Sequence, residues 1–186
     1  PRINAAGRIS TAEKAVELLL CEDKARAEEM ALELCEINLR RQKEENSIAE
    51  EAYKIIDETH DFERDRVIVL ENDSWQQGII GIVASRITEK YGMPSILITF
   101  DGSIPHLCDE SPVDLGKGSG RSVEGFNLVT ALSECSDLLE KYGGHELAAG
   151  LSIKRKNLPE FRRRLSDYVK NTSAEETLSP GYEYDM

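Results

Sequence analysis

The apolar residues of the first third of the chain recur at helical spacing. From Thr11 to Glu58 the chain contains neither proline nor glycine, and alanine, glutamate, leucine, lysine and arginine predominate. Apolar positions three and four residues apart continue through this region: Ala27, Met30, Ala31, Leu34, Ile37, Ile48, Ala52, Ile55 and Ile56. This spacing predicts amphipathic helices.

The helical region is expected to form two helices. The sequence Cys21-Glu-Asp23 marks a break between a short helix, residues 11–20, and a long one, residues 23–59. At 1.5 Å per residue the long helix would span roughly 50 Å, more than a compact domain needs. A polar stretch, residues 40–46, interrupts its apolar stripe. We interpret the helix as a connector between two domains rather than a free coiled coil, because no heptad repeat is sustained.

From Arg66 onward the pattern changes to alternating strands and helices. The predicted elements are a strand at 67–70, a helix at 78–91 whose glycines permit close packing, strands at 95–100 and 118–123, a helix at 128–142, a strand at 148–153 and a helix at 158–169. Gly143-Gly144 is expected to end the helix at 128–142. The predicted fold class is α/β, with a long connecting α-helix followed by a mixed α/β domain that begins with a β-α-β unit.

The net charge of −12 is concentrated in the helical segment. Residues 11–65 contain seventeen acidic and eight basic side chains, whereas residues 66–173 contain fourteen acidic and thirteen basic ones. An evenly acidic protein would repel nucleic acid, since backbone binding depends on Lys and Arg replacing counterions. The nearly balanced second part leaves a nucleic-acid partner open.

The rest of the composition predicts a cytoplasmic protein. The four cysteines are scattered without a C-x-x-C pair, so reduced thiols are expected rather than a zinc site or a disulfide framework. The chain has no run of about 18 apolar residues, so no membrane span is predicted. Because the chain starts at Pro1 without an initiator methionine or a signal-peptide pattern, we expect it to be a segment of a longer polypeptide.

Two glycine-rich segments carry the chemistry of a phosphate site. Residues 116–122 (GKGSGRS) include Arg121, and residues 143–150 (GGHELAAG) include His145. The Arg121 guanidinium suits bidentate phosphate binding, and Ser119, Gly120 and Ser122 add hydroxyl and backbone donors. The alternatives without a binding role are a surface salt bridge for Arg121 and a helix-capping role for His145.

No metal site is predicted within the chain. His60-Asp61 at the end of the acidic helix has no partner ligands nearby. A solvated helix end is the better account of that pair.

Four segments together resemble the RecJ family of single-strand-specific 5′-to-3′ DNA exonucleases, within the DHH phosphoesterase superfamily. They are residues 1–8 (PRINAAGR), 78–86 (GIIGIVASR), 118–127 (GSGRSVEGFN) and 143–150 (GGHELAAG), in the family's order and spacing. The resemblance implies four parts: a remnant of the junction with the catalytic DHH domain (1–10), a helical connector (11–65), the DHH-associated α/β domain (66–171) and an acidic linker (172–186) toward an oligonucleotide-binding domain.

The resemblance also implies site residues. Ser119 and Arg121 would hold the 5′-phosphate, while His145, with the backbone of Gly143 and Gly144, would face the scissile phosphate. A further set, Arg2, Asn4 and Arg8, would line the channel that admits one strand; the alternatives for this segment are a structural role or no fixed structure. Mn²⁺ or Mg²⁺ would be held by the DHH domain and none by this chain, which alone would be inactive.

The implied function is the substrate-binding half of an exonuclease of DNA repair and recombination. Its partners would be single-stranded DNA and the protein's own DHH and oligonucleotide-binding domains, with no membrane involved. Two departures stand out: Gln76 lies where the family has histidine after Trp75, and residues 102–117, with His106 and Cys108, are irregular. The alternatives are a degenerate, non-catalytic nucleic-acid or protein-binding module, or another DHH-superfamily phosphodiesterase acting on short oligonucleotides.

Overall fold

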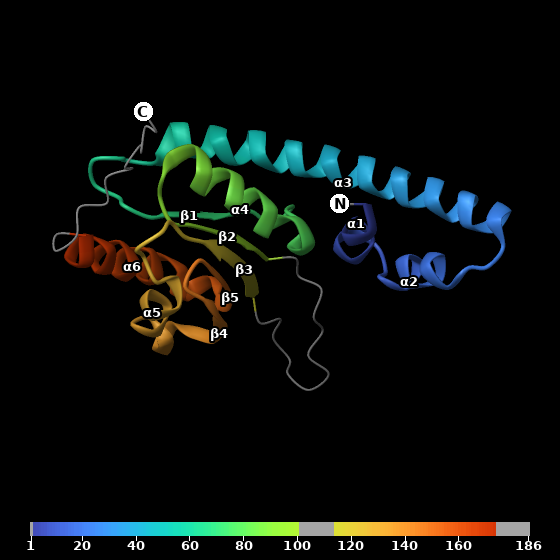
Figure 1. The fold of residues 1–186 in the computed structure, drawn as a ribbon. Coiled ribbons are helices and arrows are strands. Elements are labelled where there is room, and N and C mark those ends of the chain that lie inside the picture. The colour runs from blue at the N-terminus through green and yellow to red at the C-terminus, as the bar shows by residue number, and fades with distance from the viewer. Residues whose placement is uncertain (1, 101–113, 174–186) are drawn as a thin grey trace, which may run out of the picture.

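Three helices form the first part of the computed structural model, which describes residues 2–100 and 114–173. They are α1 (Arg2–Ile9), α2 (Glu13–Leu20) and α3 (Lys24–Thr59) (Figure 1). The Asp23 carboxylate caps α3 by accepting the Arg26 N–H at 2.8 Å. The polar break therefore separates α2 from α3 as predicted, and α3 runs unbroken for 36 residues.

The long helix α3 packs at both ends. Its first half buries Leu34 and Ile37 against α1 and α2, and its second half buries Ala52 and Ile56 against the α/β part. Trp75 links that second half to the sheet, because its indole N–H donates to Glu51 of α3 at 2.8 Å. Figure 1 shows α3 extending from the α/β part to α1 and α2.

The α/β part contains a five-stranded sheet with helices on both faces. The strands are β1 (Ile68–Glu71), β2 (Ser95–Thr99), β3 (Leu115–Arg121), β4 (Leu139–His145) and β5 (Ala148–Lys154), in the order β1-β2-β3-β5-β4. β1 and β2 are parallel and joined by α4 (Gln77–Tyr91), and the other pairs are antiparallel. The predicted α/β fold class and the β-α-β unit are thus confirmed.

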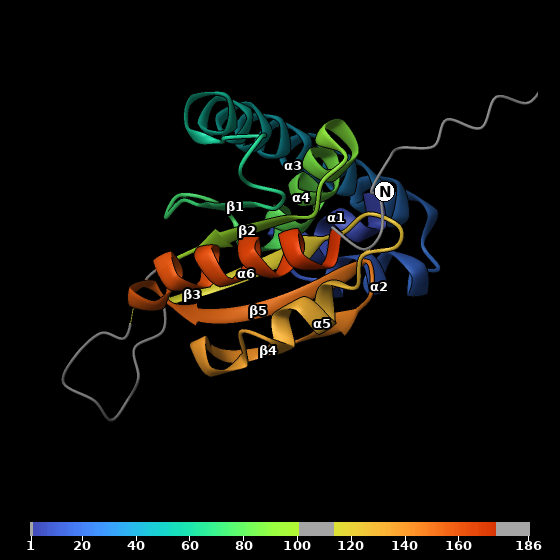
Figure 2. The same ribbon diagram turned by 90° about the vertical axis from the view of Figure 1, so that its left-hand side faces the viewer.

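The two faces of the sheet bury separate cores. α3 and α4 cover one face, and α5 (Leu128–Ser133) and α6 (Leu158–Ser173) cover the other (Figures 1 and 2). On β3 the even-numbered residues Gly116, Gly118 and Gly120 face α5 and α6, since a Cβ added to each would meet side chains of that core. The odd-numbered residues, Arg121 among them, therefore lie on the α4 face.

The prediction of one helix at 128–142 is wrong. α5 ends at Ser133, a short 3-10 turn follows at Ser136–Leu138, and β4 occupies the rest. The error arose because β4 lies at the edge of the sheet and only its first residue, Leu139, is buried, so the strand lacks an alternating apolar pattern. Gly143 and Gly144 consequently lie within a strand and do not end a helix.

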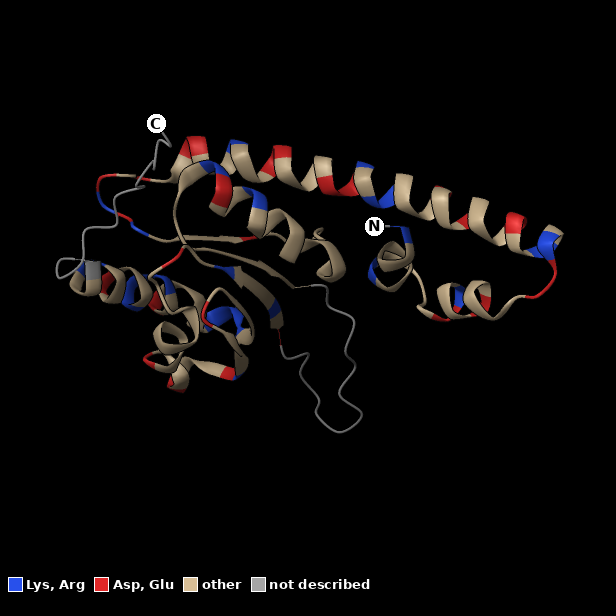
Figure 3. Cartoon of the chain, in the orientation of Figure 1, with Lys and Arg blue, Asp and Glu red and all other residues tan. Residues whose placement is uncertain are grey.

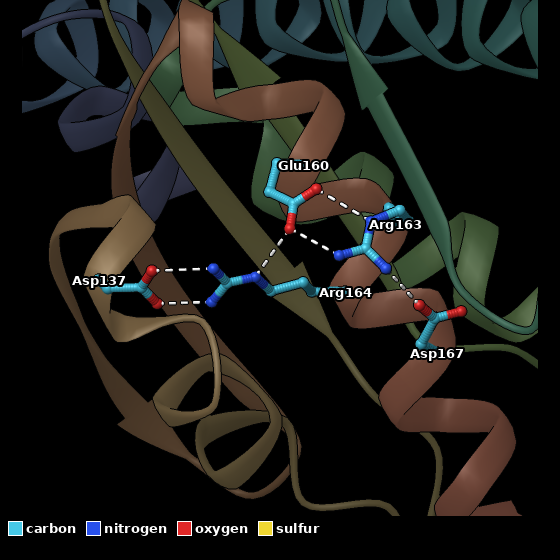
Figure 4. A network of polar contacts seen from close by, with 5 residues as sticks. All are labelled: Asp137, Glu160, Arg163, Arg164 and Asp167. Atoms are coloured by element: carbon cyan, nitrogen blue, oxygen red, sulfur yellow. Dashed lines mark hydrogen bonds and ion pairs between the residues drawn. The ribbon is translucent and has the colours of Figure 1, made fainter.

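An ion-pair network on α6 holds the segment leading into β4 (Figure 4). Arg164 donates to both carboxylate oxygens of Asp137, at 2.7 and 3.0 Å, and its Nε donates to Glu160 at 3.0 Å. Arg163 joins Glu160 to Asp167. Asp137 lies two residues before the first residue of β4, Leu139, so the network fixes the approach to that strand against α6.

The Glu160 carboxyl is expected to titrate with a pKa of about 2. Hydrogen bonds from Arg163 and Arg164 lower this pKa from 4.5. The contribution of Glu160 to folding stability is therefore complete above the unfolded-state pKa of 4.5 and is lost as the pH falls toward 2. An NMR titration of the carboxyl, with Glu160→Gln for assignment, measures this pKa; a value near 4.5 would contradict the network.

Candidate phosphate-binding site

Arg121 and His145 lie in one row across the sheet. Arg121, the last residue of β3, pairs with Ala148 of β5, which in turn pairs with His145 of β4. Residues paired directly across antiparallel strands point to the same face, so both side chains lie on the α4 face. Two strand spacings, about 10 Å, separate their backbones.

The two-residue turn that follows His145 lies against the end of β3. The carbonyl of Leu147 accepts the Ser122 N–H at 3.0 Å, and the carbonyl of Glu146 accepts the Leu128 N–H at 2.9 Å. The β4–β5 turn is thereby fastened to the end of β3 and to the start of α5. The His145 side chain remains exposed and available to a ligand.

The two glycines before His145 have different roles. Gly144 has φ of 148°, and a Cβ there would lie 2.3 Å from the Ala148 carbonyl oxygen and 2.6 Å from the Ala149 Cα. Only glycine fits at this position. A Cβ on Gly143 would meet nothing within 4 Å. Gly143 therefore borders open space that a ligand can enter, whereas Gly144 is required by the hairpin itself.

The Arg121 guanidinium lies half-buried against α4. Its Nη1 donates to the Ser119 hydroxyl at 3.1 Å and to the Gly120 carbonyl at 2.7 Å. Gly81 of α4 makes room for this group, because a Cβ there would lie 3.1 Å from Arg121 Nη2 and 2.8 Å from Ser119 Oγ. Within residues 2–100 and 114–173 no carboxylate forms an ion pair with Arg121, so the salt-bridge alternative gains no support.

A second arginine lies close to Arg121. Burial lowers the pKa of the Arg121 guanidinium, and the positive charge of Arg8 lowers it further. Arg8 is the penultimate residue of α1, and its Nη1 donates to the Gly78 carbonyl at 3.3 Å. Two neighbouring cations that lack an acidic partner among the described residues form a site that favours an anion.

α1 is held in place by packing on both α3 and α4. A Cβ at Gly78 would lie 2.0 Å from the Arg8 carbonyl oxygen, so the two helices meet backbone to backbone there. Ala5 and Ala6 of α1 are fully buried in the core that α1 forms with Leu34 and Ile37 of α3. The alternative that this N-terminal segment has no fixed structure is therefore wrong for residues 2–9.

Within residues 2–100 and 114–173, the remaining predicted site residues, Arg2, Asn4, Gly120 and Ser122, make no hydrogen bond to the side chain of Arg121 or His145 that would place them at the phosphate site, apart from the Gly120 carbonyl that accepts from Arg121. Arg2 and Asn4 are exposed toward the start of α1. The Ser122 hydroxyl donates to the Phe126 carbonyl at 2.7 Å, and its N–H is used by the β4–β5 turn. Gly120 lies in a strand flanked by β2 and β5 on both sides. The predicted backbone donors of Gly120 and Ser122 are thus engaged within the fold, while those two residues help to set Arg121 in place.

The described residues do not form a metal centre. Across residues 2–100 and 114–173 no group of three or more His, Cys, Asp or Glu side chains is arranged to hold a metal ion. His60 follows α3 and contacts Phe62, with ring centroids 4.7 Å apart, and burial lowers its pKa. His106 and Cys108 lie outside the described residues. In the same ranges no helix combines the length and apolarity needed to span a membrane.

The sequence pattern does not reveal what the two glycines Gly78 and Gly81 of α4 contact. The pattern predicts close packing along the helix at 78–91, but not that Gly78 contacts the end of α1 or that Gly81 makes room for Arg121. The signal was present in the spacing of the two glycines, which are three residues apart and so share one helix face.

Comparison with known families identifies the α/β part. A family model described as the DHHA1 domain matches residues 64–171. The chain belongs to the DHHA1 domain family. Both glycine-rich segments, with Arg121 and His145, lie inside this DHHA1 domain, and α1, α2 and α3 all precede it.

Relatives and solved structures match beyond the DHHA1 domain. The single-stranded-DNA-specific exonuclease RecJ of Bacillus subtilis is 38% identical over the whole chain, which covers 22% of that protein. RecJ of Thermus thermophilus in complex with Mg²⁺ superposes with a TM-score of 0.78 at 36% identity, over 92% of this chain and 24% of that one. An exonuclease RecJ bound to manganese gives 0.74 at 36% identity, over 96% and 42%. The resemblance to RecJ is confirmed, and the chain spans about a quarter of the first relatives' length.

Proposed function

We propose that this chain holds the 5′-phosphate end of single-stranded DNA for a RecJ-type 5′-to-3′ exonuclease of DNA repair and recombination. The observation that carries the proposal is the half-buried Arg121 guanidinium, close to Arg8 and bonded to the Ser119 hydroxyl, without a carboxylate partner among the described residues. A terminal phosphate carries more negative charge than an internal one, and a fork of guanidinium donors fits its oxygens.

His145 has the second role in this proposal. His145 lies in the same row of the sheet as Arg121, with Ala148 between them. This supports placing His145 at the scissile phosphate, which is the next phosphate along the strand from the 5′-phosphate held by Arg121 and Ser119. There its imidazole would donate a hydrogen bond to the oxygen that gains charge during hydrolysis. The open space beside Gly143 would let the strand approach the backbone closely.

The metal ions of such an enzyme would lie outside this chain. The related Thermus RecJ carries Mg²⁺ or Mn²⁺ in its crystals. The described residues here do not provide a donor set that fits either ion. We propose that a DHH domain holds the metal, that an oligonucleotide-binding domain guides the rest of the strand, and that the chain alone does not hydrolyse DNA.

Two measurements on the chain test this proposal. Binding of single strands with 5′-phosphate or 5′-hydroxyl ends, followed by fluorescence anisotropy at low salt, should favour the phosphorylated strand by about tenfold or more, since a charge-assisted hydrogen bond contributes about 1.5–3 kcal/mol. Equal affinity for the two ends would contradict the phosphate grip. With Mn²⁺ present the chain should leave the strand intact while RecJ of Bacillus subtilis degrades it; degradation by the chain would contradict a metal site elsewhere.

A further inference from the structure

The face that carries Arg121 and His145 continues along the sheet in two more rows. One row is formed by Ser119, Gly150 and Gly143, and the next by Lys117, Ser152 and Lys141. Strand positions two residues apart point to the same face, so all three rows share the surface of the phosphate site. The surface thus begins at Arg121 and His145 and ends at two lysines.

The middle row leaves the surface of the sheet open at Gly143 and Gly150, here called the open floor. A Cβ on Gly143 would meet nothing within 4 Å, and one on Gly150 would meet only the Gly118 carbonyl oxygen, at 3.8 Å. Both glycines are exposed. α4 packs over β2 and β3 on this face, next to Ser119, and leaves β5 and β4 uncovered by that helix.

The far row carries two positive charges. Lys117 on β3 and Lys141 on β4 flank the buried Ser152 on β5, about 10 Å apart at their backbones. Within the described parts of the chain neither lysine forms an ion pair with a carboxylate. Lys154, one step further along the same face of β5, is instead paired with Glu140 at 2.8 Å. Basic residues on the strands of this part are coloured blue in Figure 3.

The spacing of the rows suits one continuous strand. Lys117 and Arg121 are four steps apart along β3, roughly 13 Å. A nucleic-acid strand carries one phosphate per about 3.4 Å in a stacked helix and is longer when extended, so an internal phosphate a few nucleotides from the 5′ end reaches the lysine row.

We propose that Lys117 and Lys141 form a second phosphate subsite, which holds an internal phosphate of the strand whose 5′ end lies at Arg121. The inference rests on the proposed function and extends it. The strand backbone crosses the open floor between the rows, and the two lysines supply the charge that replaces its counterions. The subsite makes affinity depend on strand length, whereas Arg121 makes it depend on the 5′-phosphate.

The test compares strand lengths in the double variant Lys117→Gln/Lys141→Gln. Dissociation constants are measured for a 5′-phosphorylated dinucleotide and for a 5′-phosphorylated strand of about ten nucleotides. We expect about a tenfold loss for the longer strand and no change for the dinucleotide. The slope of log affinity against log salt for the longer strand should fall by about 0.7, the value for one phosphate contact in a single strand.

The matched control is Lys54→Gln/Lys170→Gln, which removes the same charge from α3 and α6. An equal loss in the control, an equal loss for both ligands, or unchanged affinity for the longer strand would overturn the subsite. Measuring the preference for 5′-phosphate over 5′-hydroxyl ends distinguishes a failure of the proposed function from a failure of the lysine subsite. Absence of this preference in the unaltered chain defeats the proposed function, whereas its presence with unchanged long-strand affinity in the double variant defeats the subsite alone.

Discussion

Replacing Arg121 with alanine should weaken binding of a 5′-phosphorylated single strand by about tenfold or more. The variant loses the fork of donors, and each charge-assisted hydrogen bond to phosphate contributes about 1.5–3 kcal/mol. Binding of the same strand with a 5′-hydroxyl end should change little, because the lost contacts are made to the terminal phosphate. Anisotropy titrations with both strands measure the two effects.

Two further variants sharpen the Arg121 test. Arg121→Lys keeps the charge but loses the planar fork, so an intermediate affinity is expected. Arg163→Ala removes an arginine whose guanidinium is already bonded to Glu160 and Asp167, and it should bind both strands as the unaltered chain does. Equal losses for the two strand ends in Arg121→Ala would show that Arg121 does not recognise the terminal phosphate.

Replacing Gly144 with alanine should destabilise the hairpin that carries His145. The new Cβ would clash with the Ala148 carbonyl oxygen and with the Ala149 Cα, and the φ of 148° is unfavourable for any residue with a side chain. Strain of this kind and a tight backbone contact together cost about 2–4 kcal/mol. Urea denaturation measures the loss, and the NMR signals of His145 should shift.

The neighbouring glycine provides the matched control. Gly143→Ala adds the same methyl group where it meets nothing within 4 Å, so the free energy of unfolding should change by less than about 1 kcal/mol. Under the proposed function the methyl group would still intrude on the open floor and weaken strand binding. Similar destabilisation by both substitutions would refute the different roles assigned to the two glycines.

The helices and the β-α-β unit could be predicted because their signals are local. Asp23 caps α3 where the pattern predicted a start, and Gly92, with φ of 64°, ends α4 as expected. The strand β4 could not be predicted in this way. Most of its residues are exposed, so they show no apolar pattern. They form a strand because they pair with β5, which comes later in the chain.

The same limit applied to the site. The sequence placed Arg121 and His145 in two glycine-rich segments, but their common row depends on the register of three strands. Because the sequence pattern predicts a helix over residues 128–142, it does not place Lys141 on a strand in the same row as Lys117. The contact of Arg8 with Gly78 was also beyond sequence patterns, since seventy residues separate the two positions.

Under the proposed function, phosphate binding at Arg121 would be coupled to the docking of α1. The Arg8 charge lies near Arg121 while the backbone contact at Gly78 holds α1 in place, so undocking of α1 would take one of the two charges away from the site. Coupling between two equilibria is reciprocal. A phosphate that binds more tightly when α1 is docked must favour the docked state by the same factor, so a strand end bound at Arg121 would also help to keep α1 against α4.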